Sequence, residues 1–188
     1  MNLLKVTFTS AWLLSLVVLG LVGCSTQYNA LSVFDSTLPM PQHFTISEHT
    51  EITKQGILAA QKYAAFWNTG EERYAHEALA TDFKDLHLPE GRVQGIEGAL
   101  SASRFFRTAV PNLKADIKEM LITNNKVIVQ FQFTGNFTGN FKEHKGQGQA
   151  IDFVAVDIYT IKEGKIIENW HLEDNLTLLM KMGVAKLQ

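Results

Sequence analysis

The chain has 188 residues, which is enough for one domain with a sizeable core. Its formal net charge is only −2 and its basic residues form no stripe or run, so the composition argues against nucleic-acid binding. The single cysteine excludes an intramolecular disulfide and a cysteine-based metal cluster. Glycine-rich phosphate loops, Gly-x-Ser-x-Gly elbows and His-Glu-x-x-His motifs are also absent from the sequence, so we expect neither a metal nor a cofactor.

Residues 1–23 have the pattern of a lipoprotein signal peptide. Lys5 precedes an apolar run, Ala11–Val22, that is short for a membrane span of about 20 residues. The run ends in Leu21-Val-Gly-Cys24, which resembles the bacterial lipobox, where a cysteine is acylated and becomes the new N-terminus. We therefore expect Cys24 to be a lipid anchor that holds the protein in the cell envelope, on the periplasmic side. Ser25 after the cysteine favours sorting to the outer membrane. The alternatives to a lipoprotein signal are an ordinary signal peptide and an uncleaved membrane helix.

Residues 24–47 contain two prolines and scattered polar residues without a sustained period. This composition is typical of a tether between the membrane and a globular domain over residues 48–188. The segment is not of low complexity, so partial packing on the domain is compatible with it.

Helical spacing of apolar and aromatic residues begins at Glu51. It predicts a helix over Glu51–Thr69, closed by Gly70, and a second helix over Glu72–Ala80. Thr81–Gly91 is predicted to be a loop. A third helix is predicted over Gly95–Val110, where Pro111 ends it.

Beyond Pro111 the pattern alternates with a period of two, which is typical of half-buried strands. The predicted strands are Leu113–Thr123, Lys126–Phe141, Gln149–Ile161 and Lys165–Asp174, with a loop or bulge within Asn136–Gly148 and a last helical turn at Leu176–Met182. Helices followed by antiparallel strands indicate an α+β domain. We expect its first helix to pack on the concave face of a curved antiparallel sheet, with a cavity open at one end.

His171 and Asp157 are the strongest candidates for chemistry, because they interrupt an apolar hairpin and a buried charge is costly unless it is paired. If the Glu163-Gly164 turn closes a plain hairpin, Asp157 opposes Trp170; with one bulge residue near Gly164, it opposes His171. In the bulged register we predict both side chains in one cavity, within about 3.2 Å or bridged by one water. His171 would then be the general base and Asp157 would orient it. The alternative is a solvated strand face.

Five further residues are candidates for the pocket. Asp174, like its neighbour Glu173, either supplies an acid or caps the last helix. His87 lies either at the pocket mouth or on a surface loop. Trp67 is either core or pocket wall. Tyr159 and Trp170 could donate hydrogen bonds to an enolate oxygen.

Seven short motifs in order resemble the SnoaL-like polyketide cyclase (ester cyclase) family of the nuclear transport factor 2-like (NTF2-like) fold. They are Phe66-Trp-Asn-Thr-Gly-Glu71, Asp82-Phe with His87-Leu-Pro-Glu-Gly91, Gly95-Ile-Glu-Gly98, Val110-Pro-Asn-Leu113, Thr134-Gly-Asn-Phe-Thr-Gly139, Gly164-Lys-Ile-Ile-Glu-Asn-Trp170 and Leu178-Leu-Met-Lys-Met-Gly183. The resemblance spans about residues 52–183.

The resemblance implies a cone-shaped α+β barrel with a deep apolar pocket, commonly in homodimers or larger homo-oligomers. It also implies cofactor-free closure of a polyketide ring by aldol condensation. In the family an aspartate on the last strand is the base and a histidine lies on the strand before it. Counted from the Gly-Lys-Ile turn, the aspartate position falls on His171 and the histidine position on Asp157, so the pair is exchanged.

Two functions follow from these patterns. The first is cofactor-free acid/base catalysis on a small apolar carbonyl compound, by proton abstraction next to the carbonyl. The second is an envelope lipoprotein, tethered through Cys24, that binds a hydrophobic ligand or a partner without catalysis. Fold similarity alone does not supply the substrate.

Overall fold

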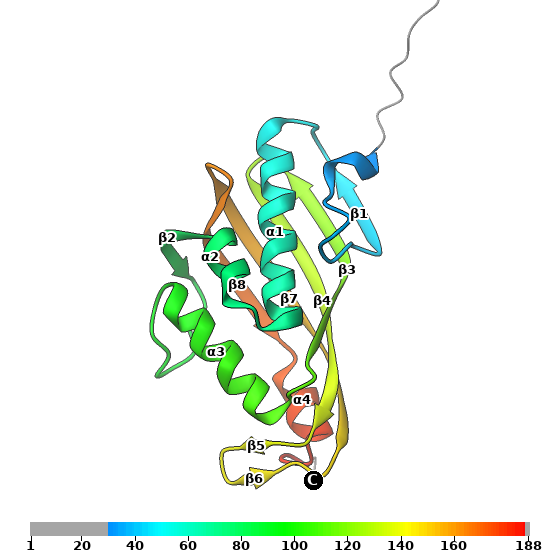
Figure 1. Ribbon diagram of the computed structural model, residues 1–188, viewed down its shortest axis with the longest axis vertical. Coiled ribbons are helices and arrows are strands. Elements are labelled where there is room, and N and C mark those ends of the chain that lie inside the picture. Colours follow the sequence, from blue (N-terminus) through cyan, green and yellow to red (C-terminus); the bar gives the residue numbers. More distant parts are fainter. Residues whose placement is uncertain (1–29, 187–188) are drawn as a thin grey trace, which may run out of the picture.

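The computed structural model describes residues 30–186, in which helices cover one face of a curved mixed sheet (Figure 1). The helices are η1 (Ala30–Val33, a 3-10 helix), α1 (Glu51–Thr69), α2 (Glu72–Ala78), α3 (Ile96–Ala109) and α4 (Asn175–Lys181). The strands are β1 (His43–Ile46), β2 (Leu79–Asp85), β3 (Lys114–Thr123), β4 (Lys126–Phe137), β5 (Asn140–Phe141), β6 (His144–Lys145), β7 (Gln149–Lys162) and β8 (Lys165–Glu173). This arrangement confirms the predicted α+β class.

The main sheet has the strand order β1-β3-β4-β7-β8-β2. Its four central strands are antiparallel, as predicted, whereas β1 runs parallel to β3 and β2 runs parallel to β8. The sheet is therefore mixed rather than wholly antiparallel. Both edge strands, β1 and β2, come from the first half of the chain, which also contains α1, α2 and α3. Each is parallel to its neighbour, so neither is linked to it by a hairpin.

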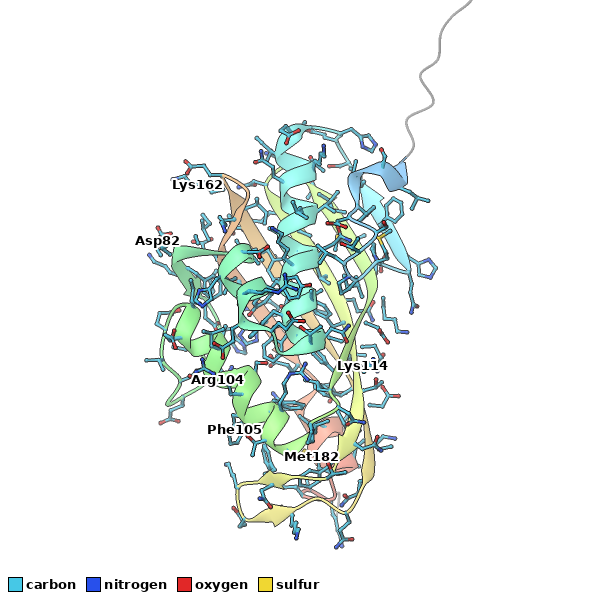
Figure 2. All side chains as sticks on the ribbon, viewed as in Figure 1. Asp82, Arg104, Phe105, Lys114, Lys162 and Met182 are labelled. Atoms are coloured by element: carbon cyan, nitrogen blue, oxygen red, sulfur yellow. The ribbon has the colours of Figure 1, made fainter. Side chains whose placement is uncertain are left out.

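Helix α1 lies across the sheet and carries the core contact between the two layers (Figure 1). The Thr50 side chain accepts a hydrogen bond from the Thr53 amide at its start, and Gly70 ends it with φ 79°. Both limits match the predicted helix. Gly56 allows close approach to the sheet, because a Cβ added there would lie 3.2 Å from Ile161 Cγ1. Side chains from both layers extend into the space between them (Figure 2).

The second and third predicted helices are shorter than expected. Helix α2 ends at Ala78, and Leu79–Asp85 forms the edge strand β2, so the prediction of a loop over Thr81–Gly91 was wrong in its first half. Leu79 and Phe83 are buried in this strand, while polar residues separate them. Helix α3 spans Ile96–Ala109, with Gly95 and Val110 as its caps.

The predicted strand over Lys126–Phe141 is divided. Strand β4 ends at Phe137, and the glycine-rich stretch that follows contains the small β5–β6 hairpin. Phe141 in this hairpin contacts Phe105 on α3, with ring centroids 5.7 Å apart. The hairpin therefore packs on α3 at the end of the molecule where α4 also lies (Figure 1).

The described part of the predicted tether packs on the domain. Val33 and Phe34 are buried, and β1 pairs with β3. The buried Gln61 amide donates to the carbonyl oxygens of Asp35 (3.0 Å) and Pro39 (3.1 Å) and accepts from the Asp35 amide (2.9 Å). The domain therefore begins well before residue 48, because a fully satisfied buried glutamine fixes this segment to α1.

The predicted signal peptide over residues 1–23 and the lipid anchor Cys24 lie outside the described residues. Within residues 30–186, no helix is both long enough and apolar enough to cross a membrane.

Candidate active site

A cavity of about 440 Å³ lies between the helices and the inner face of the sheet. It is bounded by α1, α3 and α4 and by strands β2, β4, β7 and β8. Eight aromatic side chains line it: Tyr63, Trp67, Phe83, Phe105, Phe106, Phe133, Phe141 and Phe153. A cavity of this size and composition suits a small apolar ligand.

Polar groups gather on one side of this apolar cavity. Odd-numbered residues of β7, and those of β8 from Asn169 on, point inward because side chains alternate along a strand. The polar residues that line this side are Asp85, Arg92, Asp157, Asn169, His171 and Glu173. Among the described residues, no group of His, Cys, Asp and Glu side chains has an arrangement that could hold a metal ion.

The register between β7 and β8 brings Asp157 and His171 together. Glu163 and Gly164 form the turn with φ 51° and 73°, and Lys162 pairs with Lys165. Thr160 pairs with Glu168 whereas Ile161 pairs with Ile166, so Ile167 is the extra residue of a bulge. Beyond it Asp157 pairs with His171. The bulged register is confirmed, although the bulge lies at Ile167 and not at Gly164.

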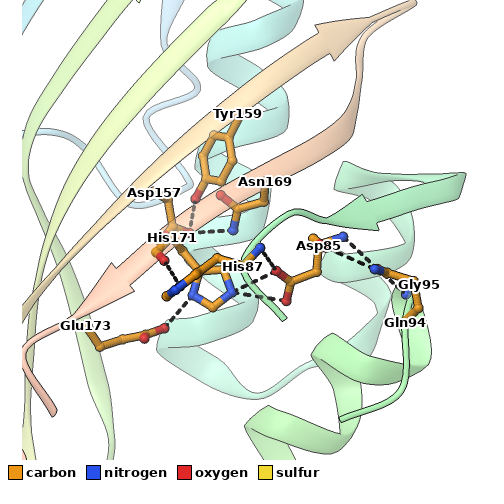
Figure 3. Close-up of polar contacts among 9 residues, drawn as sticks. All are labelled: Asp85, His87, Gln94, Gly95, Asp157, Tyr159, Asn169, His171 and Glu173. Atoms are coloured by element: carbon orange, nitrogen blue, oxygen red, sulfur yellow. Dashed lines mark hydrogen bonds and ion pairs between the residues drawn. The ribbon is translucent and has the colours of Figure 1, made fainter. Parts of the chain in front are cut away.

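The direct hydrogen bond predicted between Asp157 and His171 is not formed, and the alternative of one bridging water stays a prediction. His171 is held by two other carboxylates (Figure 3). Its Nδ1 lies 2.7 Å from Glu173 Oε1, and its Nε2 lies 3.1 Å and 3.0 Å from the two carboxylate oxygens of Asp85. Ionised carboxylates can only accept, so both ring nitrogens donate and the ring is an imidazolium. Asp157 shares the cavity with His171 but does not orient it.

The electrostatics of the site favour this charged state. Burial lowers the pKa of His171, but the hydrogen bonds to Asp85 and Glu173, with the charges of Glu173 and Asp157, outweigh it and raise the pKa to about 10. Burial raises the pKa values of Asp85 and Glu173, but their bonds to His171 bring both below the ordinary range. At neutral pH His171 is therefore not available as a free base.

Asp157, unlike His171, has a pKa close to neutral pH and an oxygen without a partner among the described residues. It is buried, and its Oδ2 accepts hydrogen bonds from the Tyr159 hydroxyl (2.8 Å) and the Asn169 amide (3.2 Å). Burial raises its pKa to about 6, even though the charge of His171 and these two bonds act in the opposite direction. Neither bond involves Oδ1. Asp157 is thus a carboxylate with one uncommitted oxygen beside an apolar cavity, and it titrates near neutral pH.

Asp85 reaches the site from the end of β2, where it pairs with Asn169 on β8. The Gln94 side chain fixes its backbone: the Asp85 amide donates to Gln94 Oε1 (2.7 Å), and Gln94 Nε2 donates to the Asp85 carbonyl (2.9 Å). Sequence reasoning missed both Asp85 and Asn169 as site residues. The only local signals were an acidic residue two positions before the predicted His87 and a polar residue two positions before His171.

The other predicted pocket residues have varied positions. Trp67 lines the cavity, which agrees with its prediction as part of the pocket wall. Tyr159 is buried, and its hydroxyl donates a hydrogen bond to Asp157. Asp174 caps α4, because its side chain accepts from the Thr177 amide at 3.0 Å. Trp170 is 38% exposed on the outer face of β8. His87 Nδ1 donates to the His171 carbonyl at 2.7 Å, and its ring lies 5.8 Å from that of Trp170.

Residues 57–182, which carry nearly all of this site, match the model of the SnoaL-like polyketide cyclase family. The protein belongs to this family. A candidate polyketide cyclase from Bacillus cereus ATCC 10987 is 37% identical, with 81% of this chain and 98% of that chain covered and a TM-score of 0.74.

More distant SnoaL-like structures share the fold. A candidate SnoaL-like polyketide cyclase from Jannaschia sp. CCS1 is 20% identical, with coverage of 74% and 99% and a TM-score of 0.64. IdmH, a candidate polyketide cyclase from Streptomyces antibioticus, is 22% identical, with coverage of 67% and 99% and a TM-score of 0.59. None of the curated proteins matches the chain.

Proposed function

We propose that this SnoaL-like protein catalyses an aldol-type ring closure without a cofactor. The substrate would be a small apolar compound that carries at least two carbonyl groups. The observation that carries the proposal is Asp157, a buried carboxylate with a pKa near 6 and an uncommitted oxygen beside an aromatic cavity. A general base works best when its pKa lies near the operating pH.

Asp157 would be the base, which reverses the roles expected from the sequence. Its Oδ1 takes the proton from a carbon next to a carbonyl group. The resulting enolate carbon attacks a second carbonyl of the same molecule, and a carbon–carbon bond forms. Asp157 then returns the proton to the new alkoxide. Protons balance over the cycle and no other reactant is needed.

His171 would stabilise negative charge rather than move a proton. Its imidazolium lies opposite Asp157, and two carboxylates hold both of its N–H groups. A fixed positive charge in a cavity sheltered from water stabilises a carboxylate and an adjacent enolate more strongly than it would in water. This role requires the charge of His171 and not a free ring nitrogen.

The base strength of Asp157 limits which carbon acids the protein could deprotonate. A carboxylate with a pKa of about 6 is a weak base, so the carbon acid must be an activated one, such as a carbon between two carbonyl groups. The aromatic side chains of the cavity wall favour a substrate with a flat, unsaturated ring system, because such rings can stack on them. We therefore propose an apolar β-dicarbonyl compound as the substrate.

Deuterium exchange tests this proposal. The protein should accelerate exchange at the central carbon of 1-phenylbutane-1,3-dione in D₂O, measured by NMR above the buffer background. Asp157→Asn should lower the accelerated rate by ~10²-fold or more. Asp116→Asn, on an exposed position of β3, is the matched control and should leave the rate unchanged. An equal rate in Asp157→Asn and the wild-type protein would reject Asp157 as the base.

A further inference from the structure

Tyr63 on α1 is a buried tyrosine whose hydroxyl proton has no acceptor among the described residues. The residue is 3% exposed and lines the cavity. The Trp67 side chain, one turn along α1, is a donor that acts to lower the pKa of Tyr63, and no described residue accepts the Tyr63 proton. Buried tyrosine hydroxyls normally find a partner, so an unused one that faces a cavity indicates a group of the ligand.

Tyr159 provides an internal comparison. Its hydroxyl donates to Asp157 Oδ2 at 2.8 Å and is therefore committed. The Tyr63 and Tyr159 rings meet edge to face, with centroids 5.7 Å apart. Tyr63 thus lies next to Tyr159, the tyrosine that bonds Asp157. Of these two tyrosines, only Tyr63 has a hydroxyl that can donate a hydrogen bond to a ligand.

The packing of α1 holds Tyr63 in place. Its ring stacks on Phe66 at 5.7 Å and contacts Trp67 edge-on at 6.3 Å. Phe66 is fully buried in the core between α1 and the sheet. A donor fixed in this way needs no reorganisation when charge develops on the ligand, which is the property that makes such donors effective in catalysis.

We propose that the Tyr63 hydroxyl is a catalytic donor, which binds the carbonyl oxygen that becomes an enolate oxygen when Asp157 removes the proton. This inference rests on the proposed function and adds the group that receives the negative charge. The ligand then bridges two elements, with its acidic carbon at Asp157 on β7 and its oxygen at Tyr63 on α1. Burial and the charge of Asp157 raise the pKa of Tyr63, so the hydroxyl keeps its proton and can donate it in a hydrogen bond.

Binding of an enolate mimic tests Tyr63 without the reaction. The parent protein is Asp157→Asn, in which the neutral amide takes the place of the protonated base. The probes are 4-nitrophenolate at about pH 8, which presents an anionic oxygen on a flat ring, and nitrobenzene, which lacks that oxygen. Adding Tyr63→Phe should weaken 4-nitrophenolate binding by ~10-fold or more, as for a hydrogen bond to a charged group. Nitrobenzene binding should stay within about two-fold.

Tyr74→Phe in the same parent is the matched control. It removes a tyrosine hydroxyl on α2 that accepts a hydrogen bond from Arg73 and does not line the cavity, so the preference for 4-nitrophenolate over nitrobenzene should be retained. Equal losses for both probes in Tyr63→Phe, no loss for either, or a parent without preference for 4-nitrophenolate would each overturn the assignment. Because no exchange is measured, failure of the exchange experiment and failure of this binding experiment are separate results.

Discussion

At the scale of single residues, the site depends on two neighbours whose pKa values are both raised, but by different causes. Asp157 and His171 pair across β7 and β8, yet burial raises the pKa of Asp157 to about 6, while hydrogen bonds to carboxylates overcome burial and raise that of His171 to about 10. The difference comes from partners. Asp157 has neutral donors, whereas His171 has two carboxylates. Environments that separate two pKa values in this way fit the proposed roles, with Asp157 as the proton acceptor and His171 as a fixed positive charge.

Removal of the His171 charge should change how stability depends on pH. The folded pKa, about 10, lies above the ordinary value of 6.5, so the stabilisation is complete below about pH 6.5 and is lost as pH rises toward 10. His171→Gln should therefore lower the free energy of unfolding by on the order of 2 kcal/mol near pH 6.5. The difference from the wild-type protein should shrink toward pH 10, as measured by urea unfolding. A difference that stays constant over this range would contradict the charged state of His171.

The identity of the inward-facing residues on β7 and β8 could be predicted from alternation, and the pairing of Asp157 with His171 followed once one bulge was assumed. The partners of His171 could not be predicted. Asp85 lies far away in the sequence, on an edge strand, and local pattern carries no signal for such a contact. The Glu173 contact was also missed, because Glu173 was expected either to supply an acid or to cap the last helix.

At the scale of elements, the loop between β2 and α3 sets the position of Asp85. Gln94 is exposed, but its amide holds both backbone groups of Asp85. Gln94→Ala should let Asp85 move away from His171 and lower the His171 pKa by up to about one unit, in line with the loss of part of one hydrogen bond. NMR titration of the His171 ring measures this shift. Gln147→Ala, on the exposed loop before β7, is the control, and an unchanged His171 pKa in Gln94→Ala would reject the positioning role of Gln94.

Helices and central strands were predicted more closely than the edges of the sheet. The limits of α1 followed from helical spacing and Gly70, and the four central strands followed from alternation. Strand β1 has only four residues, and β2 follows α2 without an intervening turn. Strand β1 is too short for a clear period of two, and the seven residues of β2 do not alternate between buried and exposed. Each strand is fixed by its parallel neighbour rather than by its own sequence.

At the scale of the whole molecule, the described residues form one layer of helices on one sheet, and the segment from residue 30 belongs to it. The envelope location remains a proposal that rests on Leu21-Val-Gly-Cys24. Cys24→Ser should move the protein from the membrane fraction to the soluble fraction, because acyl chains provide stable anchoring. Immunoblots of fractionated cells measure the distribution, and intact-mass spectrometry measures the lipid. Wild-type protein without lipid mass at Cys24 would refute the anchor.

The central claim is that Asp157 is a base whose pKa has been raised into the neutral range. The most direct test is the pH dependence of deuterium exchange into 1-phenylbutane-1,3-dione, measured from about pH 4 to about pH 8 and corrected for the buffer rate. The wild-type rate should rise through an apparent pKa near 6 and then level off, and Asp157→Asn should lose both the rate and the inflection. A wild-type profile without an inflection near pH 6, or the same inflection in Asp157→Asn, would contradict the claim.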